Sequence, residues 1–483
     1  MRRRRLVLLA LFLAWVAPSH AAVPTDANAW TSYGFDNQLT NGIQTRALTL
    51  GTVPKLRLDW SQALDGPIFA SPLSANVLGQ QLVFAATEAG TVYAADADTG
   101  TIVWQRSLGA VATPECGTWG ITSTGAIDLD RRTLFEIGAD GVLHALDLST
   151  GEERPGYPLT LVENNMYEYV WGGLRIAADR LYVGVASYCD VGPPGGPLPE
   201  GRLLAVPLAD PSNFTVWDPV PGPANMGGMW GWGGVSVDPS TGNVFTALGN
   251  STVWSDGCAC YVDDAGYGDH VVNLLSDLSE VVDADDPGIP STGDSDFGAA
   301  PLLFHPSACP VLAAANNKDG ALYVWDRNHL ADGPLLRLPL GDGIAPFVGA
   351  PAWSESKQMI YVGQSVVRSS DGARLGNGVT AWHVDPGCGF RPIWQAMVGD
   401  GSQATPLVAG NVVFATGGKP GGFFALDAAT GKQLWTFPTD GRTVAAIISA
   451  GGQVFGADTA GVLYGFSAPP GTPPPCGPSC FRS

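Results

Sequence analysis

Two acids, Asp294 and Asp296, lie one residue apart in the segment GDSDFGAAPLLF. Carboxylates this close repel each other unless a cation lies between them, so the pair predicts a bound metal ion. Residues 301–304, which end the segment, read as a buried strand. The alternative interpretation is a solvated polar turn that leads into this strand.

The composition favours one large domain made of short strands. Apolar residues make up 45% of the 483-residue chain and charged residues 14%, which is enough apolar surface for a sizeable core. The 63 glycines and 38 prolines are typical of many tight turns and not of long helices. The chain is therefore predicted to consist mainly of strands joined by turns.

Residues 1–21 are predicted to be a secretory signal peptide, because four arginines precede an apolar run and Ser19-His20-Ala21 forms an acceptable cleavage site. The alternative is a membrane anchor, and no later segment is long and apolar enough for a further span. Removal of residues 1–21 removes four arginines and no acid, so the formal net charge of −20 becomes −24. This acidity disfavours nucleic acid as a partner and suits a metal cation or a basic protein, although it also serves plain solubility. The predicted location is periplasmic or secreted.

All eight cysteines lie after the predicted signal peptide, and an even number in an exported chain predicts disulfides. Eight cysteines allow about a hundred pairings, so the sequence alone selects none of them. Zinc is a weaker alternative, because no histidine lies at ligand spacing to these cysteines. No Cys-x-x-Cys-His motif occurs, which argues against a c-type haem attached to this chain.

Four segments share one pattern: a strand of alternating apolar residues, an aspartate and a turn, which contains Thr-Gly in three of the four. The segments are TVYAADADTGTIVW (91–104), GVLHALDLSTGEE (141–153), GALYVWDRNHLADGP (320–334) and GFFALDAATGKQLW (422–435). One such sheet cannot bury both of its faces alone, and packing against neighbouring sheets around a ring solves this. The repeat is typical of a β-propeller.

We therefore predict an all-β fold over residues 22–467, an eight-bladed β-propeller of four-stranded antiparallel blades. Blade eight is short of one strand, and residues 55–64 are predicted to supply it and close the ring. The Pro-rich residues 468–483 are predicted to form a flexible tail. The predicted blades are residues 66–108, 119–160, 171–220, 228–285, 296–340, 346–399, 401–440 and 441–467.

The Asp…Thr-Gly…Trp repeat resembles the blade motif of the pyrroloquinoline quinone (PQQ) propeller proteins, in which tryptophans dock neighbouring blades together. Residues 29–60 also look like the N-terminal segment of quinoprotein alcohol dehydrogenases and polyvinyl alcohol dehydrogenases. The resemblance covers most of residues 29–467. It implies a PQQ- and Ca²⁺-dependent enzyme that oxidises a small-molecule or polymeric alcohol and, without a haem of its own, passes electrons to a separate soluble acceptor such as a cytochrome.

The resemblance also assigns roles to individual residues. GDSDFGAAPLLF matches the stretch that carries the catalytic aspartate, which makes Asp296 the expected general base and a calcium ligand, with Asp294 as additional metal support. MWGWGGVSVDPSTGNVFTALGNSTVW (229–254) matches the stretch in which a tryptophan lies flat under the quinone and an asparagine binds calcium. Those positions are Trp230 and Asn250 here, and an indole face and an amide oxygen suit these tasks.

Four more residues complete the expected site. Asp190 falls where the family has a carboxylate calcium ligand, often a glutamate. Lys318 falls where an arginine or lysine faces the quinone carbonyls and helps the ring to accept hydride, so it is expected to bind the cofactor and to take part in catalysis. Asn316 and Asn317 are expected to hydrogen-bond the carboxylates of PQQ. For each of these residues the alternative is an ordinary turn or blade-core residue.

The chain departs from the family in one respect. The alcohol dehydrogenases carry two adjacent cysteines, joined as a strained disulfide ring, over the other face of the quinone, and this chain has no Cys-Cys. The nearest counterpart, PECGTWGITSTGAID (114–128), contains only Cys116, for which Cys189 is one candidate partner across blades two and three. Cys476 and Cys480 are candidates for a small loop in the tail.

Two other classes of protein remain open from the sequence. One is a non-catalytic PQQ-like repeat propeller that serves as a binding or envelope-assembly scaffold, for which we expect an axis filled by side chains and acids that do not converge. The other is a carbohydrate-binding or lyase propeller, which the many tryptophans and aspartates permit. The enzyme interpretation predicts that five residues face one cavity, namely Asp190, Trp230, Asn250, Asp296 and Lys318.

Overall fold

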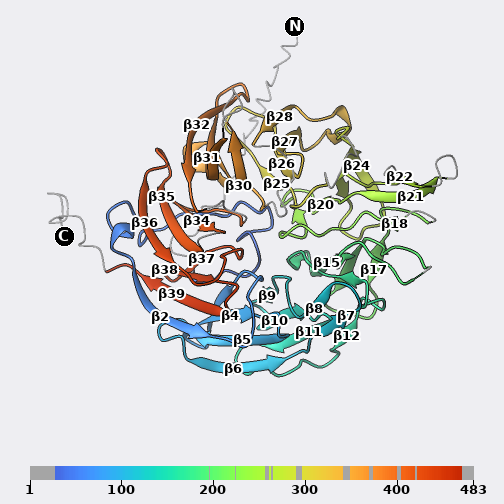
Figure 1. Cartoon of the computed structure of the whole chain (residues 1–483), viewed down its shortest axis with the longest axis horizontal. Coiled ribbons are helices and arrows are strands. Elements are labelled where there is room, and N and C mark those ends of the chain that lie inside the picture. The colour runs from blue at the N-terminus through green and yellow to red at the C-terminus, as the bar shows by residue number, and fades with distance from the viewer. Residues whose placement is uncertain are drawn as a thin grey trace, which may run out of the picture.

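The computed structural model is all-β, and its main sheets form the eight blades of a ring (Figure 1). It describes residues 28–194, 196–222, 225–255, 260–262, 265–289, 296–340, 349–368, 374–399, 404–418 and 421–469. The helices within these ranges are three single 3-10 turns, η1 (Val53–Lys55), η2 (Leu330–Asp332) and η3 (Glu355–Lys357). No described helix has the length and apolar character that crossing a membrane requires. The predicted eight-bladed propeller is confirmed.

Each blade contains four antiparallel strands, which in blades one to seven follow chain order from the centre of the ring outward (Figure 1). Blades one and two are β3 (Leu73–Val77), β4 (Gln80–Ala86), β5 (Thr91–Asp96) and β6 (Ile102–Ser107), then β9 (Ala126–Asp128), β10 (Thr133–Ile137), β11 (Val142–Asp147) and β12 (Leu159–Thr160). Blades three and four are β14 (Arg175–Ala177), β15 (Arg180–Ser187), β16 (Arg202–Pro207) and β17 (Thr215–Trp217), then β19 (Ser236–Val237), β20 (Val244–Ala247), β23 (Val271–Leu274) and β24 (Val281–Asp285).

Blades five and six are β25 (Leu302–Phe304), β26 (Leu312–Asn317), β27 (Ala321–Asp326) and β28 (Leu336–Pro339), then β29 (Ala352–Ser354), β30 (Met359–Arg368), β31 (Arg374–Val384) and β32 (Phe390–Met397). Blades seven and eight are β33 (Leu407–Ala409), β34 (Val412–Gly417), β35 (Gly422–Asp427) and β36 (Gln433–Pro438), then β37 (Ile448–Ala450), β38 (Gln453–Ala457), β39 (Val462–Ser467) and β2 (Arg57–Ala63). The remaining strands are β1 (Gly42–Ile43), β7 (Val111–Thr113), β8 (Gly117–Trp119), β13 (Glu168–Tyr169), β18 (Asn225–Met226), β21 (Ser251–Ser255) and β22 (Cys260–Val262). Two sheets have a fifth strand: β13 pairs with β15 in blade three, and β1 pairs parallel with β33 in blade seven.

The N-terminal part of the chain closes the ring. Strand β2 is the outer strand of blade eight and pairs antiparallel with β39, from Arg57 opposite Ser467 to Ala63 opposite Val462. Without β2 the outer edge of β39 would expose unpaired backbone groups. The predicted closure by residues 55–64 is therefore confirmed.

The segment that precedes β2 runs around the inside of the ring, and we call residues 30–43 the belt. Its backbone contacts the innermost strand of one blade after another, in the order of the blades. Carbonyl oxygens of the belt accept hydrogen bonds of 2.7–3.0 Å from backbone N–H groups of blades one, two, four, five, six and seven. These pairs are Trp30–Ser74, Thr31–Ile127, Asn37–Val237, Gln38–Leu303, Thr40–Trp353, Asn41–Val408 and Ile43–Gly410.

Blade three contacts the belt through Arg175, whose side chain is fully buried. Its guanidinium donates hydrogen bonds to Ser32 Oγ (2.6 Å), to the Tyr33 carbonyl (2.6 Å) and to the Asp36 carbonyl (2.9 Å). Burial lowers the pKa of Arg175 to about 10, and the Asp36 carboxylate opposes this shift. Arg175 therefore supplies, from one side chain, the kind of contact that six other blades make with their backbone.

Apolar side chains from the belt and from several blades meet inside the ring. This cluster joins two belt residues to residues of blades four, five, seven and eight, with Phe69 packed against it. Its buried members are Tyr33, Leu39, Trp232, Ala300, Ala404, Val444 and Ala446. The Tyr33 hydroxyl also hydrogen-bonds to Thr405 Oγ1 at 2.6 Å. The middle of the ring is thus filled by side chains at the level of the belt.

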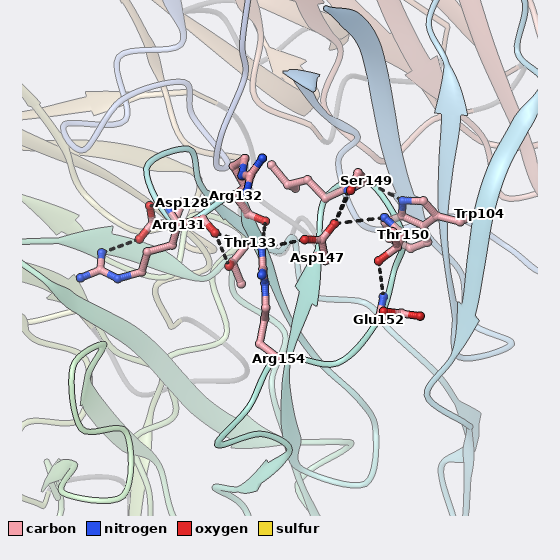
Figure 2. A network of polar contacts seen from close by, with 11 residues as sticks. Trp104, Asp128, Arg131, Arg132, Thr133, Asp147, Ser149, Thr150, Glu152 and Arg154 are labelled. Atoms are coloured by element: carbon pink, nitrogen blue, oxygen red, sulfur yellow. Dashed lines mark hydrogen bonds and ion pairs between the residues drawn. The ribbon is translucent and has the colours of Figure 1, made fainter. Parts of the chain in front are cut away.

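The repeated aspartate and tryptophan have a structural role that Figure 2 shows for blade two. Asp147 accepts a hydrogen bond from the Ser149 backbone N–H at 2.8 Å and pairs with Arg154 at 2.7 Å, which holds the turn after β11. The Trp104 indole of blade one donates to the Leu148 carbonyl of this turn at 2.9 Å. The same docking recurs in Trp60 to Ala97, Trp394 to Ala428 and Trp435 to Leu56.

Gly151 gives a specific test of this docking. A Cβ atom at Gly151 would lie 2.5 Å from the Trp104 ring, whereas one at Gly156 would meet nothing within 4 Å, and both glycines have positive φ. Each alanine substitution carries about 1–2 kcal/mol of left-handed backbone strain. We expect Gly151→Ala to lower the thermal unfolding midpoint well beyond Gly156→Ala. Equal losses in the two variants would show that the glycine is not needed for tryptophan docking.

A second prediction concerns the belt. Arg175→Met removes the donors to three belt oxygens and is expected to lower the free energy of unfolding by at least about 2 kcal/mol. Amide hydrogen exchange in residues 30–43 should accelerate in this variant. Arg327→Met removes another buried arginine, which pairs with Asp238 at 3.3 Å, and should leave exchange in the belt unchanged. Unaltered belt exchange in Arg175→Met would contradict the anchoring role.

Some predictions fall on residues outside the described ranges. These are the signal peptide at residues 1–21, the additional metal ligand Asp294, and the tail cysteines Cys476 and Cys480. Two disulfides are present in the described part of the chain, Cys116–Cys189 and Cys309–Cys388. The first is the candidate pairing named from the sequence, and the second joins blade five to blade six.

Candidate active site

A cavity of about 210 Å³ lies where the inner loops of blades three, four and five meet. Five of the residues singled out from the sequence line it together, namely Asp190, Trp230, Asn250, Asp296 and Lys318. Asp190 comes from blade three, Trp230 and Asn250 from blade four, and Asp296 and Lys318 from blade five. Residues separated by up to 128 positions in the chain therefore line one cavity. The catalytic, cofactor-binding or metal-binding role of each residue stays a prediction.

Asp296 is the centre of the polar contacts in this cavity. Its Oδ2 accepts a hydrogen bond from the Trp230 indole N–H at 2.9 Å, and its Oδ1 lies 2.8 Å from the Lys318 ammonium. The side chains of Asp296 and Lys318 are only 6% and 8% exposed. The ammonium also lies 4.4 Å from the centre of the Trp230 ring, in a cation–π contact. One indole, one carboxylate and one ammonium thus hold each other in place.

Backbone pairing fixes the distance between Asp296 and Lys318. The Lys318 N–H donates to the Asp296 carbonyl at 3.0 Å, and the neighbouring residues Phe297 and Asn317 form an antiparallel bridge. Asp296 precedes the innermost strand β25, and Lys318 follows β26 of the same sheet. The positions of Asp296 and Lys318 relative to each other are therefore determined by the strand register of blade five.

Gly249 leaves the space that this arrangement occupies. A Cβ atom there would lie 3.0 Å from Asp296 Oδ2 and 3.3 Å from the Trp230 indole. The next residue, Asn250, is half-buried, and its carbonyl accepts a hydrogen bond from Gly227 at 2.9 Å. The end of β20 thus brings a small residue against the Trp230–Asp296 pair and an amide side chain into the cavity lining.

Asp190 lies on the blade-three side of the cavity. It is exposed, has a positive φ of 57° and follows Cys189 directly. Its carboxylate accepts a short hydrogen bond from the Ser187 hydroxyl, and its backbone N–H donates to the same Ser187 Oγ at 3.1 Å. Asp190 is thus presented by a tight turn after β15, one residue from a disulfide.

Asn316 and Asn317 are placed differently from the other predicted residues. Both are buried at the end of β26, and neither belongs to the described lining of the cavity. The Asn316 amide donates to the Gly349 carbonyl at 2.6 Å, and Asn317 Oδ1 accepts the Asp319 N–H at 2.7 Å. Asn317 thus supports the turn that contains Lys318, and Asn316 links blade five to blade six, while Asn316 Oδ1 and Asn317 Nδ2 have no hydrogen-bond partner among the described residues.

Sequence reasoning missed an aromatic part of the cavity wall. Trp171 and Tyr188 of blade three line the cavity with Ser187 and Cys189. The stretch VWGGLRI (170–176) repeats the GWGGVSV pattern (231–237), but this repeat aligns Trp171 with Trp232, which belongs to the apolar cluster inside the ring. The repeat therefore does not place Trp171 at the cavity.

The donor atoms in the cavity fit a hard cation and a planar anionic cofactor. Asp190, Asn250 and Asp296 offer carboxylate and amide oxygens, which Ca²⁺ prefers. Trp230 offers an indole and Lys318 a positive charge. Within the described residues no group of three or more His, Cys, Asp or Glu side chains is preassembled for a metal. A cation here would therefore depend on the Asn250 amide as well as on the carboxylates.

The fold and this cavity define a class of protein, the eight-bladed propellers with a tryptophan-, acid- and lysine-lined site at the inner ends of the blades. A repeat family described as outer membrane protein assembly factor BamB matches residues 56–187 and 364–473, just over half of the chain. The chain belongs to the PQQ-repeat β-propeller family, which is quinoprotein alcohol dehydrogenase-like.

Individual relatives agree with this assignment. The chain is 26% identical over 491 residues to a polyvinylalcohol dehydrogenase of Sphingopyxis sp. (strain 113P3), which covers 91% of this chain and 71% of that protein. The quinohemoprotein alcohol dehydrogenase of Comamonas testosteroni has the same fold, with a TM-score of 0.68, 16% identity, and 91% and 80% of the two chains covered. BamB of Moraxella catarrhalis superposes less well, with a TM-score of 0.53, 15% identity, and 87% and 99% covered.

The buried ion pair gives a prediction that needs no cofactor. Lys318→Met leaves the Asp296 carboxylate buried without its cation and is expected to lower the free energy of unfolding by about 3–5 kcal/mol. Adding Asp296→Asn removes the uncompensated charge and should recover a large part of this loss. Urea unfolding of the single and double variants measures both effects. A double variant no more stable than Lys318→Met would show that the two groups do not stabilise each other.

Proposed function

We propose that the chain is an exported dehydrogenase that uses PQQ and Ca²⁺ to oxidise an alcohol or polyol. The observation that carries this proposal is the convergence of Trp230, Asp296 and Lys318 with two further oxygen donors on one cavity. Membership of the PQQ-repeat family and the 26% identity to a polyvinylalcohol dehydrogenase support it. A small-molecule alcohol and a polymeric alcohol are both candidate substrates.

The residues around the cavity divide between the two cofactors. Asp190, Asn250 and Asp296 are the oxygen donors that would hold Ca²⁺. The Trp230 indole offers a flat apolar face to a planar ring, and Lys318 offers a positive charge to its anionic groups. When bound, PQQ supplies the acceptor for the hydride that leaves the alcohol carbon.

Asp296 is the residue that we assign as general base. Its carboxylate would take the proton of the alcohol hydroxyl, and the Trp230 N–H and the Lys318 ammonium fix its two oxygens in place. Burial of these side chains excludes most water from the carboxylate, and Lys318 compensates its charge. Asp294 is proposed as additional metal support.

Electrons are proposed to leave through a separate acceptor. This proposal follows from the 483-residue sequence, which contains no Cys-x-x-Cys-His motif for attachment of a c-type haem. The net charge of −20 for the whole chain favours a basic soluble partner, such as a cytochrome with positive charge around its haem edge. Export to the periplasm or beyond is proposed from residues 1–21 and agrees with the two disulfides.

A non-catalytic binding or envelope-assembly scaffold is the second candidate. The filled middle of the ring favours it, because apolar side chains of the belt and several blades occupy that position. The same interpretation expects acids that do not converge, and Asp296 with Lys318 and Trp230 does not fit that expectation. The cavity lies to one side of the apolar cluster, among blades three to five, so both features exist in one molecule.

Reconstitution tests the proposal directly. The mature protein is mixed with PQQ and Ca²⁺, quinone binding is followed by tryptophan fluorescence, and dye reduction is measured over a panel of alcohols that includes poly(vinyl alcohol). We expect quinone binding that requires Ca²⁺ and dye reduction with at least one alcohol. Absence of both would leave the scaffold as the better description.

The base assignment has its own test. Asp296→Asn keeps an oxygen for the Trp230 N–H but cannot take a proton, so this variant should retain PQQ and lose turnover by about 10²–10⁴-fold. Asp326→Asn changes an acid in an outer turn of the same blade and should turn over like the unaltered protein. Normal turnover by Asp296→Asn would show that another group takes the proton.

A further inference from the structure

The hairpin β7–β8 stands outside the eight blades, in the connection between β6 of blade one and β9 of blade two. Its tip is folded on itself, because Thr113 Oγ1 accepts the Cys116 N–H at 3.1 Å and donates to the Gly117 carbonyl at 2.8 Å. The hairpin forms a separate two-stranded sheet and pairs with no described strand of a blade. It contacts blade three, which contributes one side of the cavity.

A disulfide and a group of aromatic rings join the hairpin to blade three. Cys116 at the tip is bonded to Cys189, and the two Cα atoms are 6.1 Å apart. Trp119 packs edge-on against Trp171 with ring centres 5.0 Å apart, and the Trp171 indole N–H donates to the Ser187 carbonyl at 2.6 Å. We call β7–β8 with this disulfide and Trp171 the clamp.

Two stacked tyrosines fix the clamp to blade two. The rings of Tyr169 and Tyr188 lie 4.4 Å apart, and both residues are buried. The Tyr188 hydroxyl donates to the Ala139 carbonyl at 3.0 Å, and the Tyr169 hydroxyl donates to the Gly120 carbonyl at 3.1 Å. Burial raises the pKa of both tyrosines, so they stay neutral hydrogen-bonding groups.

The clamp contacts the cavity through consecutive residues. Trp171 and the run Ser187, Tyr188, Cys189 and Asp190 all line it. Asp190 is exposed and is held by Ser187 within its own turn, so the disulfide one residue away is the nearest connection of Asp190 to another part of the fold. The position of its carboxylate relative to Asn250 and Asp296 therefore depends on the clamp.

We propose that the Cys116–Cys189 disulfide is a positioning element that holds Asp190 as an oxygen ligand for a divalent or trivalent cation, with Trp171 as an aromatic wall beside it. The proposal rests on the proposed function, which supplies the cation site. It goes beyond that function by assigning to the site a covalent support from the hairpin between blades one and two. Cys116 and Cys189 act through Asp190 and are not themselves catalytic.

The second disulfide provides a matched control. Cys309–Cys388 closes a loop of 79 residues, against 73 for Cys116–Cys189, and its Cα atoms are 5.5 Å apart. Loss of either bond should therefore cost a similar amount of stability, because loop-closure entropy depends weakly on length. Only Cys116–Cys189 adjoins the cavity lining.

Terbium luminescence measures the cation site without turnover or PQQ. Tb³⁺ has the oxygen preference of Ca²⁺, and tryptophans at the cavity can sensitise its emission. We expect Cys116→Ser/Cys189→Ser to weaken Tb³⁺ binding by about 10–100-fold, the range seen when supports of metal ligands are removed. Cys309→Ser/Cys388→Ser should bind Tb³⁺ like the unaltered protein while its thermal midpoint falls by a similar amount. Asp190→Asn should weaken binding to a similar extent as loss of the clamp.

The outcomes separate the two proposals. Equal Tb³⁺ affinity in both disulfide variants, with weaker binding in Asp190→Asn, would overturn the clamp and leave the cation site and the proposed function standing. No Tb³⁺ binding by the unaltered protein would overturn both. If Cys116→Ser/Cys189→Ser does not fold, Trp119→Leu loosens the hairpin with the disulfide intact. Weaker Tb³⁺ binding by this variant supports the clamp, and unchanged binding overturns it.

Discussion

The antiparallel pairing of β2 with β39 closes the ring, and the packing of all eight blades depends on this closure. A four-stranded blade exposes two apolar faces, and each face is covered only by the next blade, so the arrangement is stable when it has no first or last member. Strand β2 removes that end by completing blade eight. The Trp60 indole of β2 then docks on the Ala97 carbonyl of blade one, which makes the join similar to the other interfaces.

The regular and the specialised parts of the ring lie in different stretches of the chain. The family match covers residues 56–187 and 364–473, and the tryptophan docks lie at the interfaces of blades eight, one and two and of blades six, seven and eight. The stretch between the matches contains Asp190, Trp230, Asn250, Asp296 and Lys318. There blade five is joined to its neighbours by the Arg327–Asp238 ion pair and the Cys309–Cys388 disulfide. The matched stretches thus contain the tryptophan docks, and the stretch between them contains the lining of the candidate site.

The sequence predicted the blades well because the signals are local. Alternation of apolar residues, the Asp-to-Gly turn and the following tryptophan each arise within one blade, and the missing strand of blade eight pointed to residues 55–64. The belt was not predicted, because most of its hydrogen bonds to the blades are accepted by backbone carbonyl oxygens. Every residue type has such an oxygen, so the sequence pattern does not reveal these contacts. Trp171 was missed for a related reason, since it reaches the cavity through the packing of blade three against an extra hairpin. The expected contact of Asn316 and Asn317 with a cofactor stays a prediction. Each amide makes one hydrogen bond within the protein, whereas Asn316 Oδ1 and Asn317 Nδ2 have no partner among the described residues.

The belt also ties the beginning of the chain to the whole ring. Residues 30–43 contact the innermost strands of seven blades in succession, and strand β2 completes the eighth. Each blade is therefore held by its neighbours and by the N-terminal segment as well. Loss of this segment would remove contacts from all eight blades at once.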